Sequence, residues 1–175
     1  MKTIDIVGKN YYGHWKNERT ACRAIIIRDG KILVTYETKN DGQYMIPGGG
    51  LEEGETTDEC VVREIIEETG YVIKPSSCLL QINEFYEDWK FISLFFLGEV
   101  VGEAEVHLTK QEEEVGMECR WEPLSEVMEA FSHHQDYAET DEMRRGMYYR
   151  EYTALTTILG DMDNSGESLG DKARI

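Results

Sequence analysis

One short acidic stretch constrains the fold of this chain more than any other part of its sequence. Residues 49–71 read GGLEEGETTDECVVREIIEETGY. Seven of them are glutamates, namely Glu52, Glu53, Glu55, Glu59, Glu64, Glu67 and Glu68. Because like charges repel at short range, so many carboxylates must either face solvent or hold a cation. Their spacing favours the cation.

The residues around these glutamates predict a helix that begins and ends within the stretch. Thr56 is a typical N-cap, and Glu59 three residues later completes a capping box. Gly70 supplies the left-handed residue that commonly ends a helix. The sequence therefore predicts a helix over Thr57 to Thr69.

This helix has two chemically distinct sides. Its aliphatic residues form one broad arc at about 100° per residue, which indicates burial: Val61, Val62, Ile65 and Ile66. Glu64, Glu67 and Glu68 fall on the other side, where like charges at this spacing destabilise a helix. Arg63 offsets that repulsion only in part. A hard divalent cation would offset it, since Mg²⁺ takes oxygen ligands and bridges substrate phosphates. A solvated acidic helix surface is the alternative interpretation.

The spacing of the whole stretch resembles a known family motif. Gly49 is followed by five residues and Glu55, then by seven residues and the run REIIEETGY that begins at Arg63. This is similar to the Nudix box, G-x5-E-x7-R-E-U-x-E-E-x-G-U, in which U is a bulky aliphatic residue. Eight of its nine defined positions match, and Tyr71 at the last position departs from the pattern. The chain thus resembles the Nudix (MutT-like) hydrolases, with residues 49–71 as the box.

The resemblance implies an α/β fold, the Nudix fold, in which a mixed β-sheet lies between helices as an α/β/α sandwich. We expect a single domain over residues 1–160 and a flexible polar tail over residues 161–175. Asp29-Gly30 and Glu87-Asp88 are predicted turns, and residues 103–116 a charged loop. Strands are predicted over 21–28, 31–36, 43–46, 79–86, 89–101 and 117–121, and further helices begin near Ser125, as a cap, and at Asp141. The aromatic strand residues around Phe91 are expected in the core, rather than as a platform for stacking bases.

The resemblance also implies a metal site. The expected ligands are the side chains of Glu64, Glu67 and Glu68 and the backbone carbonyl of Gly48, with Mg²⁺ or Mn²⁺ as the cofactor. Orienting or structural roles are expected for Gly49, Glu55, Arg63 and Gly70. Arg63 is expected to pair with Glu55 or Glu67, and so to orient these carboxylates.

The reaction implied by the resemblance is attack of water on phosphorus in a diphosphate linkage. Its substrates are nucleoside diphosphates joined to another moiety, and positioning and cations matter most to its charged transition state. Glu64 and Glu67 are expected catalytic residues. The general base is expected to be Glu64 or a glutamate of the 103–116 segment, where we favour Glu114, with Glu112 and Glu113 as alternatives.

The substrate itself is weakly encoded. Tyr86, fifteen residues past Tyr71, resembles the tyrosine of the dinucleoside-polyphosphate type and is a candidate substrate contact. The proline of the ADP-ribose type is absent there, the coenzyme A and NADH signatures are not apparent, and an oxidised-nucleotide triphosphatase remains open. Two other functions also stay open. One is regulatory binding of a nucleotide ligand without turnover, and the other is isomerisation of an isoprenoid diphosphate.

The composition of the chain excludes some classes of binding partner. The 175-residue chain has a formal net charge of −17, which argues against binding to nucleic acid or to an anionic membrane. We expect a nucleotide-type small molecule as the partner, with a homodimer left open. The four cysteines form no C-x-x-C pair, and the first 19 residues lack the apolar core of a signal peptide, so a cytoplasmic location is expected.

Two patterns near the C-terminus resemble a metal site and a catalytic pair, but we expect neither to have that role. Asp161, Asp163, Ser165 and Gly166 match the start of a calcium-binding EF-hand loop, but Lys172 stands where its bidentate glutamate is required. His133-His134 has no partner at ligand spacing, and we expect two ordinary polar residues at a helix end.

Overall fold

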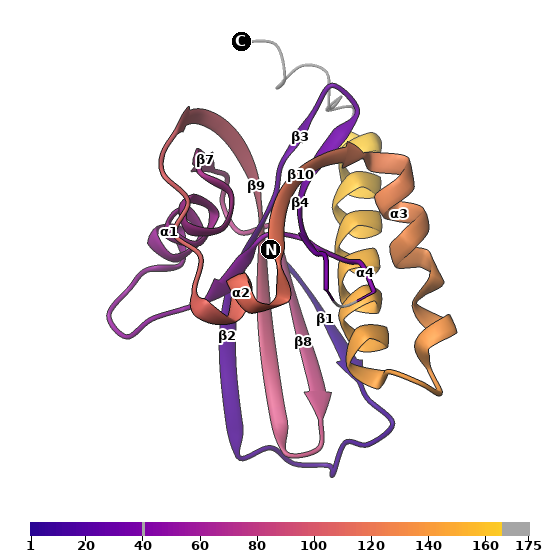
Figure 1. The fold of residues 1–175 in the computed structure, drawn as a ribbon. Coiled ribbons are helices and arrows are strands. Elements are labelled where there is room, and N and C mark those ends of the chain that lie inside the picture. The colour runs from indigo at the N-terminus through magenta and orange to yellow at the C-terminus, as the bar shows by residue number, and fades with distance from the viewer. Residues whose placement is uncertain (40, 166–175) are drawn as a thin grey trace.

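Two β-sheets form the centre of the chain (Figure 1), seen in a computed structural model that describes residues 1–39 and 41–165. The larger sheet has the order β1-β8-β9-β2-β6, with β7 also paired to β9. Its strands are β1 (Lys2–Val7), β2 (Asn17–Ile25), β6 (Gly48–Gly50), β7 (Tyr71–Pro75), β8 (Leu80–Tyr86) and β9 (Trp89–Glu103). The sheet is mixed, because β1 runs parallel to β8 and β2 parallel to β9 while the other pairs are antiparallel.

The smaller sheet is antiparallel and has the order β10-β4-β3, with β5 paired to β4. Its strands are β3 (Ile27–Arg28), β4 (Lys31–Glu37), β5 (Gln43–Met45) and β10 (Met117–Pro123). The predicted turn at Asp29-Gly30 is confirmed, since both residues have positive φ, as a tight two-residue hairpin requires. The predicted strand over 21–28 is corrected: it divides into β2 and β3, which belong to different sheets.

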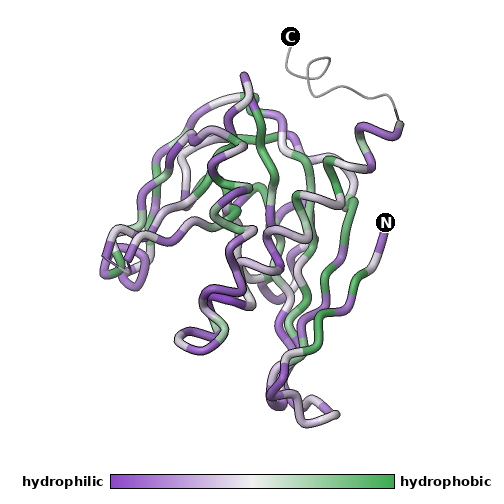
Figure 2. The backbone as a smooth tube through the Cα atoms, turned by 90° about the vertical axis from the view of Figure 1, so that its right-hand side faces the viewer, coloured by the Kyte–Doolittle hydropathy of each residue, from purple (hydrophilic) through white to green (hydrophobic). Residues whose placement is uncertain are grey.

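Helices cover the larger sheet on both sides (Figure 1). They are α1 (Thr57–Thr69), α2 (Lys110–Val115), α3 (Leu124–Ser132), the 3₁₀ helix η1 (His133–Tyr137) and α4 (Glu142–Ser165). Along β2 the side chains alternate, so that Cys22 and Ala24 pack in the core with α1 while Ile25 packs in the core with α4. Figure 2 shows the apolar residues concentrated in the central strands and the polar ones at the loop tips. This is the predicted α/β sandwich with a mixed sheet.

Several elements differ from the sequence-based prediction. The sequence does not predict β1 and β7, because both are short and carry little alternation. α2 lies in the predicted loop over 103–116, although Thr109 and Glu112 form the same capping box that predicted α1. Ser125 is not the cap of α3, because the helix already begins at Leu124 and Pro123 stands at the N-cap. α4 continues through Asp161 and Asp163 into the predicted tail, while Gly166 and Lys172 lie outside the described residues.

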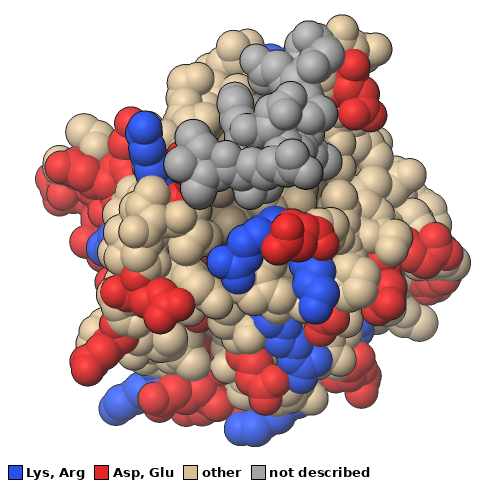
Figure 3. All heavy atoms as spheres, turned by 90° about the horizontal axis from the view of Figure 1, so that it is seen from above, with Lys and Arg blue, Asp and Glu red and all other residues tan. Residues whose placement is uncertain are grey.

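The surface agrees with the acidic composition. In the view from above in Figure 3, basic side chains lie among acidic ones rather than in a separate patch. Within residues 1–39 and 41–165, no helix combines the length and apolar character needed to cross a membrane.

Candidate functional site

Helix α1 is built as its sequence predicts. The hydroxyl of Thr56 accepts a 3.3 Å hydrogen bond from the Glu59 backbone N–H, and Glu59 Oε2 accepts one of 2.9 Å from the Thr56 N–H. At the other end Gly70 has φ 73° and donates its N–H to the Ile66 carbonyl. The confirmed bounds of the helix place Glu64, Glu67 and Glu68 in its last two turns, beside the β6 glycines.

Arg63 connects the acidic residues of this region. Its Nε and Nη2 donate to the two carboxylate oxygens of Glu55, at 2.8 and 3.0 Å. Its Nη1 donates to Glu64 at 2.8 Å and to Glu67 at 3.1 Å, and Nη2 also reaches the Gly50 carbonyl at 3.0 Å. The hydrogen bonds from Arg63 lower the pKa of Glu55 to about 2. Arg63 therefore orients three glutamates at once, which extends the pairing predicted from the sequence.

Glu68 is the most buried of the box glutamates. Only 8% of its surface is exposed, and burial raises its pKa to about 8 in spite of a 2.8 Å hydrogen bond from the Gly48 N–H. Burial also raises the pKa of Glu64. Desolvation penalises the charged form of a carboxyl group, so both side chains stand to gain from a cation placed beside them.

The glycines of β6 allow these carboxylates to approach the sheet. Gly48 has φ 137°, and a Cβ there would overlap the carbonyl oxygen of Cys22. A Cβ on Gly49 would overlap the carboxylate of Glu64. Gly48 is therefore required by its backbone conformation, and Gly49 leaves the space in which the Glu64 carboxylate lies.

These residues line a pocket of about 540 Å³, whose charged lining we divide into an acidic wall and a basic wall. The acidic wall consists of Glu52, Glu64, Glu67, Glu68 and Glu112. The basic wall consists of Arg19, Arg23 and Arg150, whereas Arg63, which also lines the pocket, is bound to the acidic residues. An anionic ligand between the walls would meet arginines on one side and would need a cation on the other.

The basic wall is held by buried carboxylates behind it. Arg150 of α4 donates to Glu84 at 3.2 Å and to Glu151 at 2.6 Å, and Glu151 is fully buried. Arg23 Nη1 lies 4.0 Å from Glu151 and donates to the carbonyls of Ile46 and Gly48, at 3.1 and 3.3 Å. The Gly48 carbonyl predicted as a metal ligand is thus already an acceptor, though a carbonyl oxygen has a second lone pair.

The downstream glutamates are placed differently from one another. Glu112 lines the pocket from α2, and its Oε2 accepts a 2.6 Å hydrogen bond from the Thr109 N–H. Glu113 and Glu114 are exposed, and neither lines the pocket. The backbone carbonyl of Glu114 accepts a bond from Lys39. Of the three downstream candidates for the base, only Glu112 lines the pocket, as Glu64 of the box also does.

The donor set fits a hard divalent cation, because carboxylate and carbonyl oxygens converge on one pocket and the buried Glu68 lacks a full counter-charge. In the described part of the chain, however, no three His, Cys, Asp or Glu side chains are gathered as a ready metal cage. Arg63 holds oxygens of Glu64 and Glu67 instead. Cation binding therefore requires these two carboxylates to turn partly away from Arg63.

Other residues singled out in the sequence lie elsewhere. Tyr86 is at the end of β8, against Gly8 and Gly146, and does not line the pocket. Tyr71 accepts a 3.1 Å hydrogen bond from the Trp121 indole, so this departure from the box pattern serves packing. His133 pairs with Glu129 and Asp136, and His134 packs on Tyr149, as expected of ordinary helix residues.

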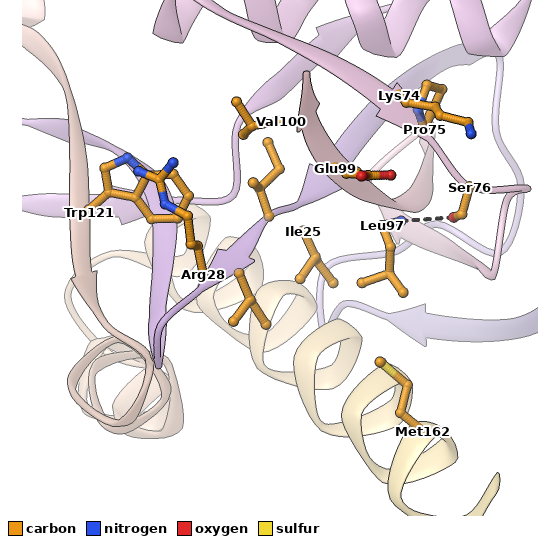
Figure 4. Close-up of a pocket in the computed structure, with 13 residues that line it drawn as sticks. Ile25, Arg28, Lys74, Pro75, Ser76, Leu97, Glu99, Val100, Trp121 and Met162 are labelled. Carbon is orange, nitrogen blue, oxygen red and sulfur yellow. Dashed lines mark hydrogen bonds between the residues drawn. The ribbon is translucent and has the colours of Figure 1, made fainter. Parts of the chain in front are cut away.

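A second cavity of about 400 Å³ lies apart from this site (Figure 4). It is mostly aliphatic, with Arg28 stacked over Trp121 at 4.5 Å and Met162 of α4 at one side. None of the predicted metal or catalytic residues lines it. This aliphatic cavity is therefore not part of the predicted metal site.

The sequence reasoning missed the whole basic wall. A charged residue inside an otherwise apolar strand was the available signal for Arg23, in the run ACRAIII. Arg150 lies among the tyrosines of the helix predicted to begin at Asp141, and no local pattern marks it as a site residue. Arg19 and Arg150 are separated from the box by long stretches of chain, and only the fold brings them to it.

Comparison with known proteins gives the family. Residues 18–143 match the model of the NUDIX domain. An ADP-ribose pyrophosphatase of Methanocaldococcus jannaschii is 38% identical over 95 residues, which are 52% of this chain and 56% of that protein. A NUDIX hydrolase from Nitrosomonas europaea has a similar fold, with a TM-score of 0.56 and 21% identity over 79% of this chain and 90% of its own. A MutT NUDIX hydrolase from Burkholderia pseudomallei reaches a TM-score of 0.50 and 25% identity over 63% and 86%.

The family match covers more than half of the chain, and it includes the box and every residue that lines the pocket except Arg150. The chain therefore belongs to the NUDIX domain family. It spans about half the length of the curated relative from Methanocaldococcus jannaschii.

Proposed function

We propose that the chain is a Mg²⁺-dependent hydrolase that cleaves a diphosphate linkage in a nucleoside diphosphate joined to another moiety. The observation that carries the proposal is the pocket in which the box carboxylates face three arginines. A diphosphate between these walls has both of its charged sides compensated, provided that a cation joins it to the acidic wall.

The acidic wall supplies the cation site. Glu64, Glu67 and Glu68 would hold Mg²⁺ or Mn²⁺, and the Gly48 carbonyl is available as a further oxygen donor. When bound, such a cation neutralises charge on the phosphoryl oxygens and lowers the pKa of water. Arg63 keeps the carboxylates within reach of one another and stabilises the site before the cation arrives.

The proton of the attacking water needs an acceptor. We now favour Glu112 over Glu114 for this role, because Glu112 lines the pocket and Glu114 does not. The hydrogen bond from Thr109 uses Oε2 of Glu112, so Oε1 remains for the water. Glu64 and Glu67 stay as alternative bases, since both line the same wall.

The basic wall holds the phosphates. Arg23 and Arg150 are fixed by Glu151 and Glu84, so they are oriented before the substrate binds. Fixed guanidinium groups stabilise the charge that spreads over the phosphoryl oxygens in the transition state.

ADP-ribose is the first substrate to test, because a curated relative is named an ADP-ribose pyrophosphatase. The test is release of AMP from ADP-ribose, and of mononucleotide or phosphate from a panel of nucleoside diphosphate derivatives, dinucleoside polyphosphates and oxidised nucleoside triphosphates. Turnover with Mg²⁺ that EDTA abolishes supports the proposal. Nucleotide binding without turnover across the panel would instead establish a regulatory ligand-binding protein.

A further inference from the structure

The pocket extends past the acidic wall along the register of β2 and β9. Three successive residues of β2 on one side of the sheet, Arg23, Ala21 and Arg19, line it. Ala21 pairs with Ser93 of β9, and Arg19 pairs with Phe91. Directly paired residues present their side chains on the same side of a sheet. The pocket floor therefore runs from Arg23, past two small residues, to Arg19 and Phe91. The Arg19 guanidinium reaches back along this floor and lies beside Gly50, which pairs with Ala21.

The length of this floor suits a nucleotide. Arg23 lies next to Gly48, whose N–H holds Glu68, so it marks the diphosphate end. Arg19 is four residues away along the strand, or about 13 Å at roughly 3.3 Å per residue. Ala21 and Ser93 leave the space between open. A ribose and a base joined to the diphosphate would extend over this floor to Phe91.

Phe91 presents an aromatic face at the outer end of the floor. Its ring is stacked on Trp89, with centroids 5.3 Å apart and planes only 8° from parallel. Trp89 is 38% exposed, so the stack begins at the surface and ends in the pocket. This corrects the prediction that Phe91 belongs to the core. A backed aromatic ring at a pocket end is the arrangement on which a base stacks.

Arg19 is the one pocket arginine whose charge is not already used by a described residue. The side chains of Arg23, Arg63 and Arg150 each pair with carboxylates. The side chain of Arg19, in contrast, has no hydrogen bond or ion pair with any described residue. Its guanidinium lies beside Gly50, where an added Cβ would come within 3.1 Å of Nη2. In a chain of net charge −17, an arginine without a carboxylate partner in the described structure remains free to bind an anion.

We propose that Arg19 and Phe91 form a nucleoside subsite. The aromatic base stacks on the Phe91 ring, which Trp89 supports from behind, and Arg19 binds the phosphate that carries the ribose. The subsite rests on the proposed function for its diphosphate end, and it adds the two residues of this chain that would recognise the nucleoside part of the substrate.

Equilibrium binding tests the subsite without turnover. AMP and ribose 5-phosphate, which lacks the base, are titrated into the full chain in EDTA and followed by calorimetry. In the native chain we expect AMP to bind more tightly than ribose 5-phosphate. Phe91→Leu should weaken the binding of AMP roughly tenfold, the equivalent of about 1.4 kcal/mol, and leave the affinity for ribose 5-phosphate unchanged. Arg19→Gln should weaken the binding of both ligands.

Matched variants guard against misfolding. Phe91→Tyr keeps an aromatic face and should retain AMP affinity, whereas Tyr12→Leu removes an aromatic ring that is 63% exposed and outside the pocket, and should change nothing. Equal affinities of the native chain for the two ligands, or unchanged AMP affinity in Phe91→Leu, would overturn the subsite.

The two proposals fail separately. Turnover of nucleotides with an AMP affinity that does not depend on Phe91 would remove the subsite and leave the hydrolase. AMP binding that depends on Phe91, without turnover of any member of the panel, would remove the hydrolase and leave the subsite.

Discussion

The backbone N–H of Gly48 donates a 2.8 Å hydrogen bond to Oε2 of Glu68, and this bond joins the edge strand β6 to the last turn of α1. Glu68 is the carboxylate that burial perturbs most among the predicted metal ligands, with a pKa of about 8. Gly48 in turn accepts a hydrogen bond from Arg23 of the basic wall. The acidic and the basic residues of the pocket therefore meet at one residue, Gly48, through its N–H and its carbonyl oxygen.

Replacing Glu68 with glutamine should separate folding from turnover. The amide oxygen of the new side chain can still accept from the Gly48 N–H, so the fold is retained, but the negative charge available to a cation is lost. We expect Glu68→Gln to lose most Mg²⁺-dependent turnover, by at least about tenfold in kcat/KM, with native-like circular dichroism. Full activity in this variant at saturating Mg²⁺ would refute the role of Glu68 as a metal ligand.

The same carboxyl group predicts how stability changes with pH in EDTA. Its pKa of about 8 in the folded chain lies above the ordinary 4.5, so the folded chain binds this proton more tightly. Its contribution to stability is complete below pH 4.5 and is lost as the pH rises towards 8, by an amount on the order of a few kcal/mol. The loss should be visible as a decrease in Tm that Glu68→Gln lacks.

Mg²⁺ should reverse that loss. A ligand that binds only the folded chain stabilises it, and cation binding requires the ionised carboxylate. We expect a larger increase in Tm on adding Mg²⁺ at about pH 8 than at about pH 6, measured by differential scanning fluorimetry. An equal increase at both pH values, or the same increase in Glu68→Gln, would contradict this linkage.

The Arg63–Glu55 pair should stabilise the box independently of any cation. The pair is bidentate and largely shielded, with 25% and 13% of the two side chains exposed. Arg63→Lys keeps the charge but not the two parallel hydrogen bonds. It should lower the free energy of unfolding in urea by about 1–3 kcal/mol at about pH 7. Because the pKa of Glu55 is lowered to about 2, its contribution is present above pH 4.5 and declines as the pH falls towards 2. The difference between the native chain and the variant should therefore shrink at about pH 3.

Short-range patterns were sufficient to predict α1 and its acidic side. The capping box of Thr56 and Glu59, the glycine at 70 and the spacing of the glutamates are all local, and the structure keeps each of them. The motif also predicted that Arg63 pairs with Glu55 or Glu67, and the structure shows both pairings, each within the box.

Long-range contacts were beyond such patterns. Arg23 lies on β2, which pairs with β9, and Arg150 lies on α4. The two arginines approach the same carboxylate, Glu151, because α4 packs on the sheet, and no single segment of the sequence encodes that packing. A local signal does distinguish the downstream glutamates. Thr109 and Glu112 form a capping box, and in the helix that follows Glu112 lines the pocket whereas Glu114 does not.

Two of the three glutamates of α2, Glu112 and Glu114, provide a matched test of the base. Glu112→Gln retains the capping interaction, since glutamine also serves at this helix position, but cannot accept a proton. We expect kcat to decrease about 100-fold or more, in the range of general base catalysis, with little change in KM. Glu114→Gln, on the exposed side of the same short helix, should keep kcat within about twofold. A larger decrease in kcat in Glu114→Gln than in Glu112→Gln would indicate that Glu114 is the base.

The buried charges behind the basic wall predict a large loss of stability. Glu151 is fully buried and holds Arg150 at 2.6 Å, with Arg23 at 4.0 Å. Glu151→Gln removes the counter-charge from two buried guanidinium groups, and breaking such a pair typically costs about 3–5 kcal/mol. Glu53→Gln, at an exposed position of the same chain, should stay within about 0.5 kcal/mol. Chemical unfolding at about pH 7 measures both. A loss below about 1 kcal/mol in Glu151→Gln would mean that solvent or a rearranged carboxylate compensates the arginines, and the basic wall would then not be fixed before substrate binds.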